Sequence, residues 1–339
     1  MTKVGVIGLG MMGWTHLDCY ARRDDVQVVA VSDKDPERLS GKQRAGGNIE
    51  GQAQGGFVLE GAQLYDEGLK LIADTLVDLV DVCLPTPLHV DYAIAALEAG
   101  KHVMVEKPVA RTASDAQWLV EVAEQSPGLS MPGMCMRFWP GWDWLKRVIG
   151  EGRYGAPLSA HFHRVTSHPG GSFYRDGSQC GGALLDLHVH DTDFVKHCFG
   201  MPEAVFSRGY SRITSEPDHI MTQYLYGDGP MVSAEGGWTM CDGFGFQMRY
   251  TVNFERATAI YDLAQNEPLR VIESGKDPQP IELAPGMGYE YEIAYLIDCV
   301  ARNQAPVTVS IRDAAESMQI VEAEKRSMAE GQPVTISPH

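Results

Sequence analysis

Short apolar runs alternate with amphipathic segments along the first third of the chain. The strand-like runs cover residues 4–7, 26–31, 76–84 and 101–105, and the helix-like segments cover residues 11–22, 90–99 and 113–125. Such alternation is typical of βαβ units, in which right-handed crossovers join parallel strands and place helices on both faces of the sheet. Residues 41–61 are rich in glycine and follow neither period, so we expect a long surface loop there.

The pattern changes after Ser126-Pro127-Gly128. We expect a strand over 129–137, a helix over 142–149, a polar loop over 167–179, a helix starting near 181–182, and final helices over 289–302 and 311–329. Between about 203 and 273, short strands and tight turns follow one another, which indicates an antiparallel sheet. The pattern therefore predicts an N-terminal α/β domain (1–127) and a C-terminal α+β domain (128–339), with the last helix packing back near the first domain.

Composition and charge narrow the environment and the partners. A length of 339 residues suits two domains, and 44% apolar with 22% charged residues is ordinary for a globular protein. The apolar stretches are far shorter than the ~18 residues of a membrane span, and the first residues do not read as a signal peptide. Seven scattered cysteines without a C-x-x-C motif fit reduced thiols, and a net charge of −17 disfavours nucleic acid and anionic membranes. We therefore expect a cytoplasmic protein that binds neither nucleic acid nor membranes.

The segment Gly8-Leu9-Gly10-Met11-Met12-Gly13 has the glycine spacing of a dinucleotide-binding fingerprint. It follows the first strand and opens the first helix, where backbone N–H groups bind a pyrophosphate. Asp33 ends the second strand about 20 residues later, the position at which a carboxylate binds the ribose 2′-hydroxyl. Because a carboxylate there repels a 2′-phosphate, NAD is favoured over NADP, although Lys34 beside it weakens the preference.

Lys107 comes directly after the strand at 101–105, in the segment Glu106-Lys107-Pro108. Ligands of an open α/β sheet bind at the carboxyl ends of its strands. An ammonium group at such an end can donate a hydrogen bond to a substrate oxygen and stabilise a developing alkoxide. The alternative is a surface lysine before a turn proline.

Several motifs together resemble the glucose–fructose oxidoreductase/inositol dehydrogenase/rhizopine-catabolism (Gfo/Idh/MocA) family. They are the glycine fingerprint, Asp33, the run Leu84-Pro85-Thr86-Pro87-Leu88-His89, and the stretch Ala99-Gly100-Lys101-His102-Val103 leading into Glu106-Lys107-Pro108. The resemblance covers essentially the whole chain. It implies a Rossmann domain, a C-terminal domain with a large, mostly antiparallel open sheet that joins subunits into a homodimer or homotetramer, and a sugar, cyclitol or related polyol as substrate.

The resemblance also implies roles for individual residues. The cofactor site would include Leu84, Pro85, Thr86, His89, Glu106 and Lys107, together with the fingerprint residues, Asp33 and Lys34. The Lys107–Pro108 peptide bond would be cis.

The second informative segment runs from Gly181 to Asp193 and carries an acid and a histidine four residues apart. On a helix, Asp186 and His190 share a face. The segment looks like the family's glycine-rich helix, and the resemblance implies that His190 is the general acid or base, Lys107 its cationic partner and Asp186 the carboxylate that positions substrate. His188 points about 100° away from both on an α-helix, so we expect no metal site there and place His188 in packing or in the substrate pocket.

Other side chains are candidates for contact with substrate. They are Trp14, Arg137, His168, Tyr174, Asp193 and Trp238. For Arg137 a structural salt bridge is nearly as good an interpretation, and for Trp14 and Trp238 the alternative is ordinary core packing.

The function predicted from the sequence is NAD-dependent hydride transfer at a secondary hydroxyl or ketone of a sugar, cyclitol or related polyol. Two alternatives share the fold. One is a glycosidase that uses held NAD for transient oxidation, and the other is a regulatory protein that senses NAD without catalysis. Retention of Lys107, Asp186 and His190 argues against the regulator.

Overall fold

The computed structural model describes residues 1–42, 52 and 59–336. The chain forms two compact units: residues 1–135 with 287–315, and residues 136–286 with 316–339. This division does not coincide with a single boundary after residue 127, because a C-terminal segment returns to the first unit.

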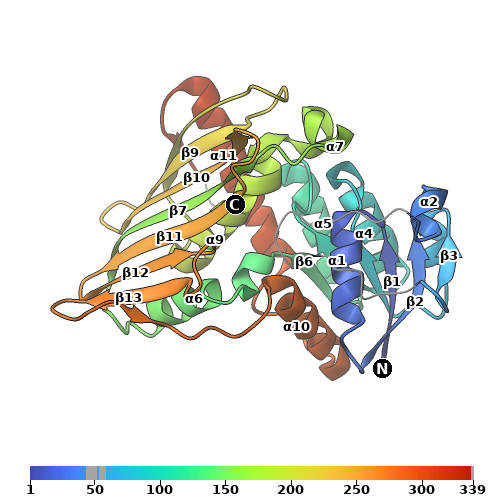
Figure 1. Ribbon diagram of the computed structural model, residues 1–339. Helices are drawn as coiled ribbons and strands as arrows, with labels where there is room; N and C mark the ends of the chain where they lie inside the picture. The colour runs from blue at the N-terminus through green and yellow to red at the C-terminus, as the bar shows by residue number, and fades with distance from the viewer. Residues whose placement is uncertain (43–51, 53–58, 337–339) are drawn as a thin grey trace. The chain divides into compact units, whose positions relative to one another are not determined.

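The first unit is built on a six-stranded parallel sheet with the strand order β3-β2-β1-β4-β5-β6. Its strands are β1 (Thr2–Ile7), β2 (Val26–Ser32), β3 (Gln63–Tyr65), β4 (Leu79–Val82), β5 (His102–Glu106) and β6 (Ser130–Gly133). The chain order reverses beside β1, where β2 lies on one side and β4 on the other (Figure 1). In a doubly wound sheet such a switch point opens a crevice at the carboxyl ends of the strands, where ligands bind.

The helices of the first unit are α1 (Met11–Tyr20), α2 (Pro36–Leu39), α3 (Gly68–Ile72), α4 (His89–Glu98), α5 (Ala113–Gln125) and α10 (Gly288–Arg302). Four of them, α1, α4, α5 and α10, agree with the hydrophobic pattern, whereas α2 and α3 were not predicted. Thr112 caps α5, since its hydroxyl accepts a hydrogen bond from the Asp115 N–H at 3.1 Å. Arg22 after α1 pairs with Glu290 of α10 at 2.6 Å, which ties the returning segment to this unit. Most of the loop expected at 41–61 lies outside the described residues.

Two expectations about local structure were wrong in detail. The strand expected over 129–137 ends at Gly133, and a 3-10 helix follows over Cys135–Phe138. The N–H of Met134 bonds to the Pro132 carbonyl, which turns the chain out of the sheet. The polar segment 167–179 is not an irregular loop, because it contains α7 (Gly171–Arg175) and α8 begins within it (Gly177–Cys180).

The second unit contains a nine-stranded sheet with the order β14-β13-β12-β11-β7-β10-β9-β8-β15. Its strands are β7 (Pro157–Ser167), β8 (Ala204–Tyr210), β9 (His219–Leu225), β10 (Met231–Met240), β11 (Phe246–Phe254), β12 (Ala257–Asp262), β13 (Leu269–Glu273), β14 (Gln279–Pro280) and β15 (Val334–Thr335). As expected, the sheet is mostly antiparallel; the exception is the parallel pair of β7 and β10.

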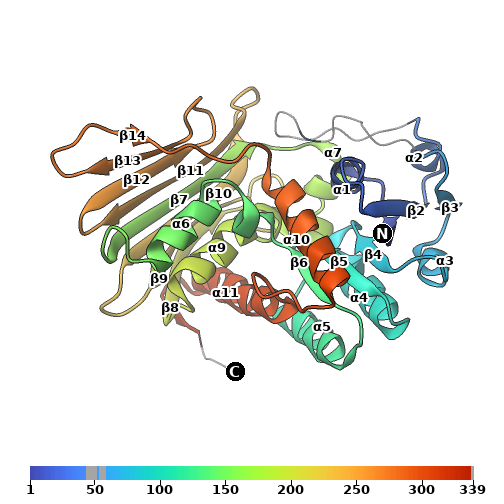
Figure 2. The same cartoon turned by 90° about the horizontal axis from the view of Figure 1, so that it is seen from below.

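Helices cover one face of the nine-stranded sheet. Figure 2 shows α6 (Trp142–Gly150), α9 (Val189–Phe199) and α11 (Ile311–Glu330) on that face. Burial alternates along the strands, as in β7, where Ala160 and Phe162 face the helices and His161 is exposed. Trp142 of α6 forms the centre of the core, with its ring 4.8 Å from Phe194 and 5.6 Å from Phe162. None of the helices in the described part of the chain combines the length and the apolarity needed to cross a bilayer.

Candidate active site

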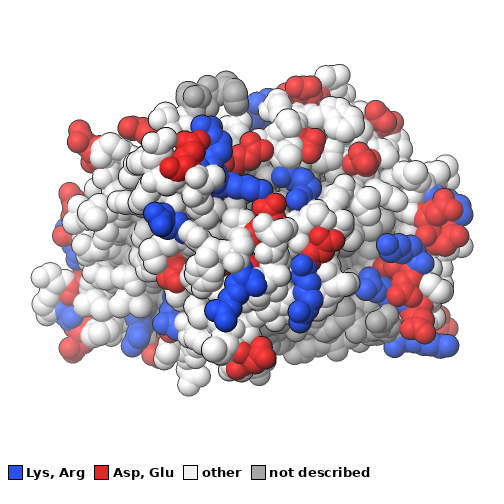
Figure 3. All heavy atoms as spheres, turned by 90° about the horizontal axis from the view of Figure 1, so that it is seen from above, with Lys and Arg blue, Asp and Glu red and all other residues white. Residues whose placement is uncertain are grey.

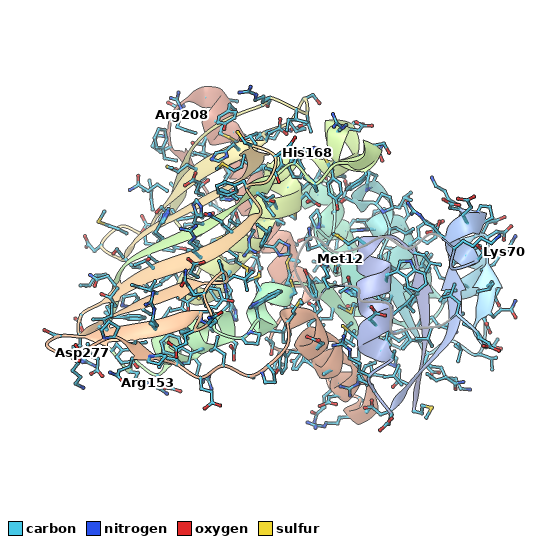
Figure 4. The ribbon with its side chains drawn as sticks, in the orientation of Figure 1. Met12, Lys70, Arg153, His168, Arg208 and Asp277 are labelled. Carbon is cyan, nitrogen blue, oxygen red and sulfur yellow. The ribbon has the colours of Figure 1, made fainter. Side chains whose placement is uncertain are left out.

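The glycine fingerprint forms the tight turn between β1 and α1. Gly8 has a φ of +98°, and a Cβ there would lie 2.4 Å from the Cys83 carbonyl oxygen. A Cβ on Gly13 would lie 1.9 Å from the Gly8 oxygen, whereas a Cβ on Gly10 would meet nothing within 4 Å. Gly8 and Gly13 therefore permit close packing, and Gly10 leaves the backbone open to a ligand. Met12, in the first turn of α1, is labelled in Figure 4.

Asp33 follows β2 and is 7% exposed. Its Oδ2 accepts a hydrogen bond from the Leu9 N–H at 2.8 Å, so the carboxylate also fixes the glycine turn. Arg38 Nη1 lies 3.6 Å from the same oxygen. Sequence reasoning missed Arg38 and named the neighbouring, exposed Lys34 as the local cation.

His89 links the loop after β4 to the turn after β5. Its Nδ1 lies 2.7 Å from the Pro108 carbonyl oxygen and its Nε2 lies 2.6 Å from the Leu84 carbonyl oxygen. Only a doubly protonated ring donates to both oxygens, but burial lowers the pKa of His89 and favours the neutral ring. At neutral pH one nitrogen therefore donates and the other makes a close contact. Leu84, Pro85 and Thr86, all predicted to contact cofactor, lie in the loop that His89 holds.

A buried cluster lies next to Lys107. Glu106 Oε2 accepts a hydrogen bond from the Lys107 N–H at 3.0 Å, and Glu106 Oε1 lies 3.1 Å from His16 Nε2. His16 Nδ1 is 2.8 Å from Asp81 Oδ2. Burial would lower the pKa of His16, but the charges and hydrogen bonds of Asp81 and Cys83 together outweigh burial, so the pKa is raised and the cation is favoured.

Glu292 of α10 completes this cluster. Both its carboxyl oxygens are buried and accept no hydrogen bond from the described residues. Burial first, and then the nearby Glu106, raise its pKa, so the group is a neutral acid. Sequence reasoning found Glu106 and Lys107 but missed His16, Asp81 and Glu292, because no motif marks them. The Lys107–Pro108 bond is cis, as predicted, and the Lys107 side chain is half-buried at the end of β5.

The acid–histidine segment is not a regular α-helix throughout. Gly181 and Gly182 have φ values of +77° and +71°, and a π-helical turn over Leu184–His188 precedes α9. Four residues make about one turn of either helix type, so Asp186 and His190 remain on one side, as predicted. Both side chains are half-buried.

His188 points into the core of the second unit. Its side chain is fully buried, and its Nε2 lies 3.4 Å from Glu324 Oε1 of α11. A Cβ on Gly236 of β10 would come within 2.6 Å of His188 Nδ1, so the glycine makes room for the ring. Burial would lower the pKa of His188, but Glu324 outweighs burial and the pKa is raised. Of the two expectations for His188, packing is the one that the structure shows.

Two buried acids of α9 pair with arginines. Arg137 Nε and Nη2 each donate to Asp193 at 2.8 Å, and these side chains are 2% and 1% exposed. Arg164 of β7 donates to both oxygens of Asp191 at 2.8 and 3.1 Å. For Arg137 the structural salt bridge is what the structure shows, and Asp193, predicted to contact substrate, is its partner. Burial would raise the pKa of Asp193, but Arg137 outweighs burial and the pKa is lowered.

Three predicted substrate residues lie together in the second unit. The His168 ring centroid is 5.4 Å from that of Trp238, and the Tyr174 ring is 6.0 Å from it. His168 Nε2 lies 3.1 Å from the Tyr174 carbonyl oxygen, and Figure 4 labels His168 after β7. Trp238 itself is fully buried and donates to Asp218 at 2.9 Å, and Trp14 in the first unit is 1% exposed. Core packing therefore describes both tryptophans.

Charges on the surface are mixed in sign. On the face drawn in Figure 3, lysine and arginine side chains lie next to aspartate and glutamate side chains. Such a surface does not form the single basic stripe that is the electrostatic footprint of a nucleic-acid-binding protein. The chemistry of the described residues is instead that of a dinucleotide turn, a lysine at a strand end and an acid–histidine pair.

Comparison with known proteins agrees with this geometry. Residues 2–133 match an oxidoreductase family with an NAD-binding Rossmann fold, and residues 142–260 match the GFO/IDH/MocA C-terminal domain. Myo-inositol 2-dehydrogenase of Thermotoga maritima is 31% identical over 220 residues, which are 63% of this chain and 60% of that protein. Inositol 2-dehydrogenase 4 of Saccharopolyspora erythraea is 32% identical over 266 residues, 76% of this chain and 72% of that protein.

The first of these relatives is therefore matched over less than two thirds of its own length. Among solved structures, levoglucosan dehydrogenase in complex with NADH and levoglucosan has a TM-score of 0.86 over 99% of this chain and 100% of that chain. At 21% identity this likeness shows a shared fold.

The Arg137–Asp193 pair generates a stability prediction. Arg137→Met leaves a buried carboxylate without its counter-charge, and we expect a loss of about 3–5 kcal/mol in the free energy of unfolding. Arg137→Met/Asp193→Leu removes both charges and should recover most of the loss. Because the pKa of Asp193 lies below its ordinary value of 3.8, the stabilisation is present above about pH 4 and is lost as pH falls further.

Urea denaturation of the full chain at pH 7 and at pH 3–4 measures these effects. The matched control is Arg153→Met, which breaks an exposed pair with Glu151 and should leave the midpoint nearly unchanged. A single mutant as stable as the wild type at pH 7 contradicts the prediction.

Proposed function

The chain belongs to the GFO/IDH/MocA oxidoreductase family, and we propose that it is an NAD-dependent dehydrogenase that transfers a hydride between nicotinamide and a secondary hydroxyl or ketone of a sugar, cyclitol or related polyol. The observation that carries the proposal is the glycine turn held by a buried carboxylate, in a chain that also has Lys107 at a strand end and the Asp186–His190 pair. The relatives named inositol dehydrogenases support the substrate class.

The first unit fits NAD. Gly8 and Gly13 form a cradle that a Cβ would fill, and Gly10 leaves room for the pyrophosphate. Asp33 would accept hydrogen bonds from the ribose hydroxyls, and the turn at Glu106-Lys107 would lie against the cofactor. When bound, NAD supplies the acceptor or donor of the hydride. We propose that residues 1–127 bind the cofactor and that residues 128–339 bind substrate and a second copy of the chain.

Proton transfer is assigned to His190. His190 would accept the hydroxyl proton of the substrate on a ring nitrogen, because an imidazole can act as an acid or a base near neutral pH. Lys107 donates a hydrogen bond to the same substrate oxygen and stabilises its negative charge. Asp186 orients the ring and the substrate hydroxyls. His168 and Tyr174 provide an aromatic wall beside the sugar.

The open face of the nine-stranded sheet supports an oligomer. Exposed apolar side chains lie on several of its strands: Tyr210, Met221 and Met231, which are 51%, 52% and 70% exposed. Burial of such a face between copies would give a homodimer or homotetramer. All seven cysteines are free, and six are buried, which supports the cytoplasm as the compartment.

NADH formation across a panel of inositols, pyranoses and sugar acids tests the proposed activity. We expect at least one substrate to give NADH in a one-to-one ratio with the oxidised product. Release of free sugar without accumulating NADH would identify the glycosidase alternative. Binding of NAD without turnover of any member of the panel would favour the regulator.

Asp33 generates a prediction about cofactor choice. NAD should bind at least ~10-fold more tightly than NADP, about 1.4 kcal/mol, because the carboxylate repels a 2′-phosphate. Asp33→Ser should reduce the difference between the affinities for NAD and NADP. Adding Arg38→Ala to that variant should increase this difference in affinity again. Arg38 lies 3.6 Å from Asp33 and would pair with the 2′-phosphate of NADP. Calorimetric titration with NAD and with NADP measures the two affinities. Equal affinities in the wild type would refute the prediction.

The roles of His190 and Lys107 predict different kinetic defects. His190→Ala should lower kcat by ~10²–10⁴ with little change in NAD affinity. Lys107→Ala should lower kcat/KM more than kcat, because it loses substrate affinity as well. Since both residues act on one substrate oxygen, the fold-loss of kcat/KM in the double variant should be smaller than the product of the losses in the single variants.

His197→Ala is the matched control for His190→Ala. His197 is a half-buried histidine seven residues further along α9. Its variant should keep kcat within ~10-fold. Loss of activity in His197→Ala with retention in His190→Ala would overturn the assignment of the proton acceptor.

A further inference from the structure

Three histidines surround one carboxylate on the open face of the nine-stranded sheet, outside the residues assigned to hydride transfer. His161 and His163 stand two residues apart on β7 and therefore point to the same face. In the parallel pairing with β10, Ser233 is the partner of His161 and Glu235 is the partner of His163. His219 comes from the adjacent strand, β9.

The ligand atoms of His161, His163 and Glu235 are close enough to converge. One donor atom from each lies within 4.8 Å of the other two, and His163 Nδ1 is already 3.2 Å from Glu235 Oε2. Around a tetrahedral ion with bonds of about 2.1 Å, donor atoms stand about 3.4 Å apart. The exposed His161 ring therefore needs to move by at most about 1.4 Å, the difference between 4.8 and 3.4 Å, which is within the range of a small side-chain rotation.

The neighbours of these ligands orient them. His219 Nε2 lies 2.9 Å from Glu235 Oε1, so this oxygen is held by the histidine while Oε2 faces His163. The Tyr210 ring stacks on His219 at 5.3 Å with an interplanar angle of 4°. His161 Nδ1 is 3.0 Å from the Ser233 hydroxyl, and its Nε2 makes no hydrogen bond to any of the residues that the structure describes. Metal sites use this kind of outer hydrogen bond to fix the tautomer and the direction of each ligand.

The local charge also suits a cation. Arg249 of β11 stands opposite His163, but its guanidinium lies 3.6 Å from Asp262 and is compensated there. The carboxylate of Glu235 is then the charge that faces the two imidazoles. Arg208 of β8, labelled in Figure 4, lies three strands from β7 in the strand order.

We propose that His161, His163 and Glu235 bind a divalent transition-metal ion of the zinc class, with His219 orienting the carboxylate. Two imidazoles and one carboxylate are a donor set that such ions prefer, whereas Mg²⁺ and Ca²⁺ prefer oxygen donors alone. The ion joins β7 to β10 on the face of the sheet opposite α6 and α9. It acts as a structural tie and takes no part in hydride transfer.

Calorimetric titration of the EDTA-treated full chain with ZnCl₂ tests the proposal. We expect one Zn²⁺ per chain and a rise in the melting temperature on binding. CoCl₂ should give the visible absorption of a low-symmetry site with nitrogen donors. His161→Ala, His163→Ala and Glu235→Gln should each weaken binding at least ~10-fold.

His102→Gln is the control, because it removes a half-exposed histidine in the first unit. Its Zn²⁺ affinity should match the wild type. The melting temperature of each metal-free variant shows whether it folds. If the alanine variants do not fold, the isosteric Glu235→Gln variant provides the test. Absence of Zn²⁺ binding, or wild-type affinity in both His163→Ala and Glu235→Gln, overturns the proposal. NADH formation is measured separately, so failure of the dehydrogenase assignment does not affect this result.

Discussion

Buried ion pairs fix the helix that carries the candidate acid–base pair. Asp191 and Asp193 of α9 lie on different sides of the helix, and each accepts two hydrogen bonds from an arginine, Arg164 and Arg137 respectively. A buried carboxylate is costly unless it is paired and hydrogen-bonded, so these contacts restrict α9 to one rotation about its axis. At that rotation His190 is half-buried, as is Asp186 in the π-helical turn that precedes α9. Asp191 and Asp193 therefore serve the structure of the helix, and Asp186 and His190 remain available for chemistry.

The first unit uses the same principle at Lys107. The neighbouring Glu106 is held by His16, and His16 by Asp81, in a cluster without exposed charge. Glu106 in turn accepts from the Lys107 N–H, which fixes the backbone of the turn while the ammonium group stays half-buried. In both units a rigid, buried polar network supports a neighbouring residue that is partly accessible. Such support is what precise positioning of a catalytic group requires.

Local signals in the sequence were sufficient to predict the parallel sheet and the glycine turn, and the resemblance to the family was sufficient to predict the cis bond. Alternating apolar segments specify βαβ units, and Gly8 and Gly13 stand where no side chain fits. The roles of His16, Arg38 and Glu324 were not predictable, because each depends on partners far away in the sequence. The π-helical turn at Leu184–His188 was also missed, since the pattern of apolar residues does not distinguish it from an α-helix. For Arg137 the sequence did not distinguish contact with substrate from a salt bridge, because its partner Asp193 is also far away in the sequence.

The most direct test compares two neighbouring residues of α9, the buried Asp191 and the half-buried His190. Single-turnover hydride transfer and melting temperature are measured on Asp191→Asn and His190→Asn with the best substrate. Asp191→Asn should lower the melting temperature by on the order of 10 °C while the folded protein keeps its hydride-transfer rate within ~10-fold. His190→Asn should leave the melting temperature nearly unchanged and lower the rate at least ~100-fold. The reverse pattern, stability lost at His190 and chemistry lost at Asp191, would contradict the account.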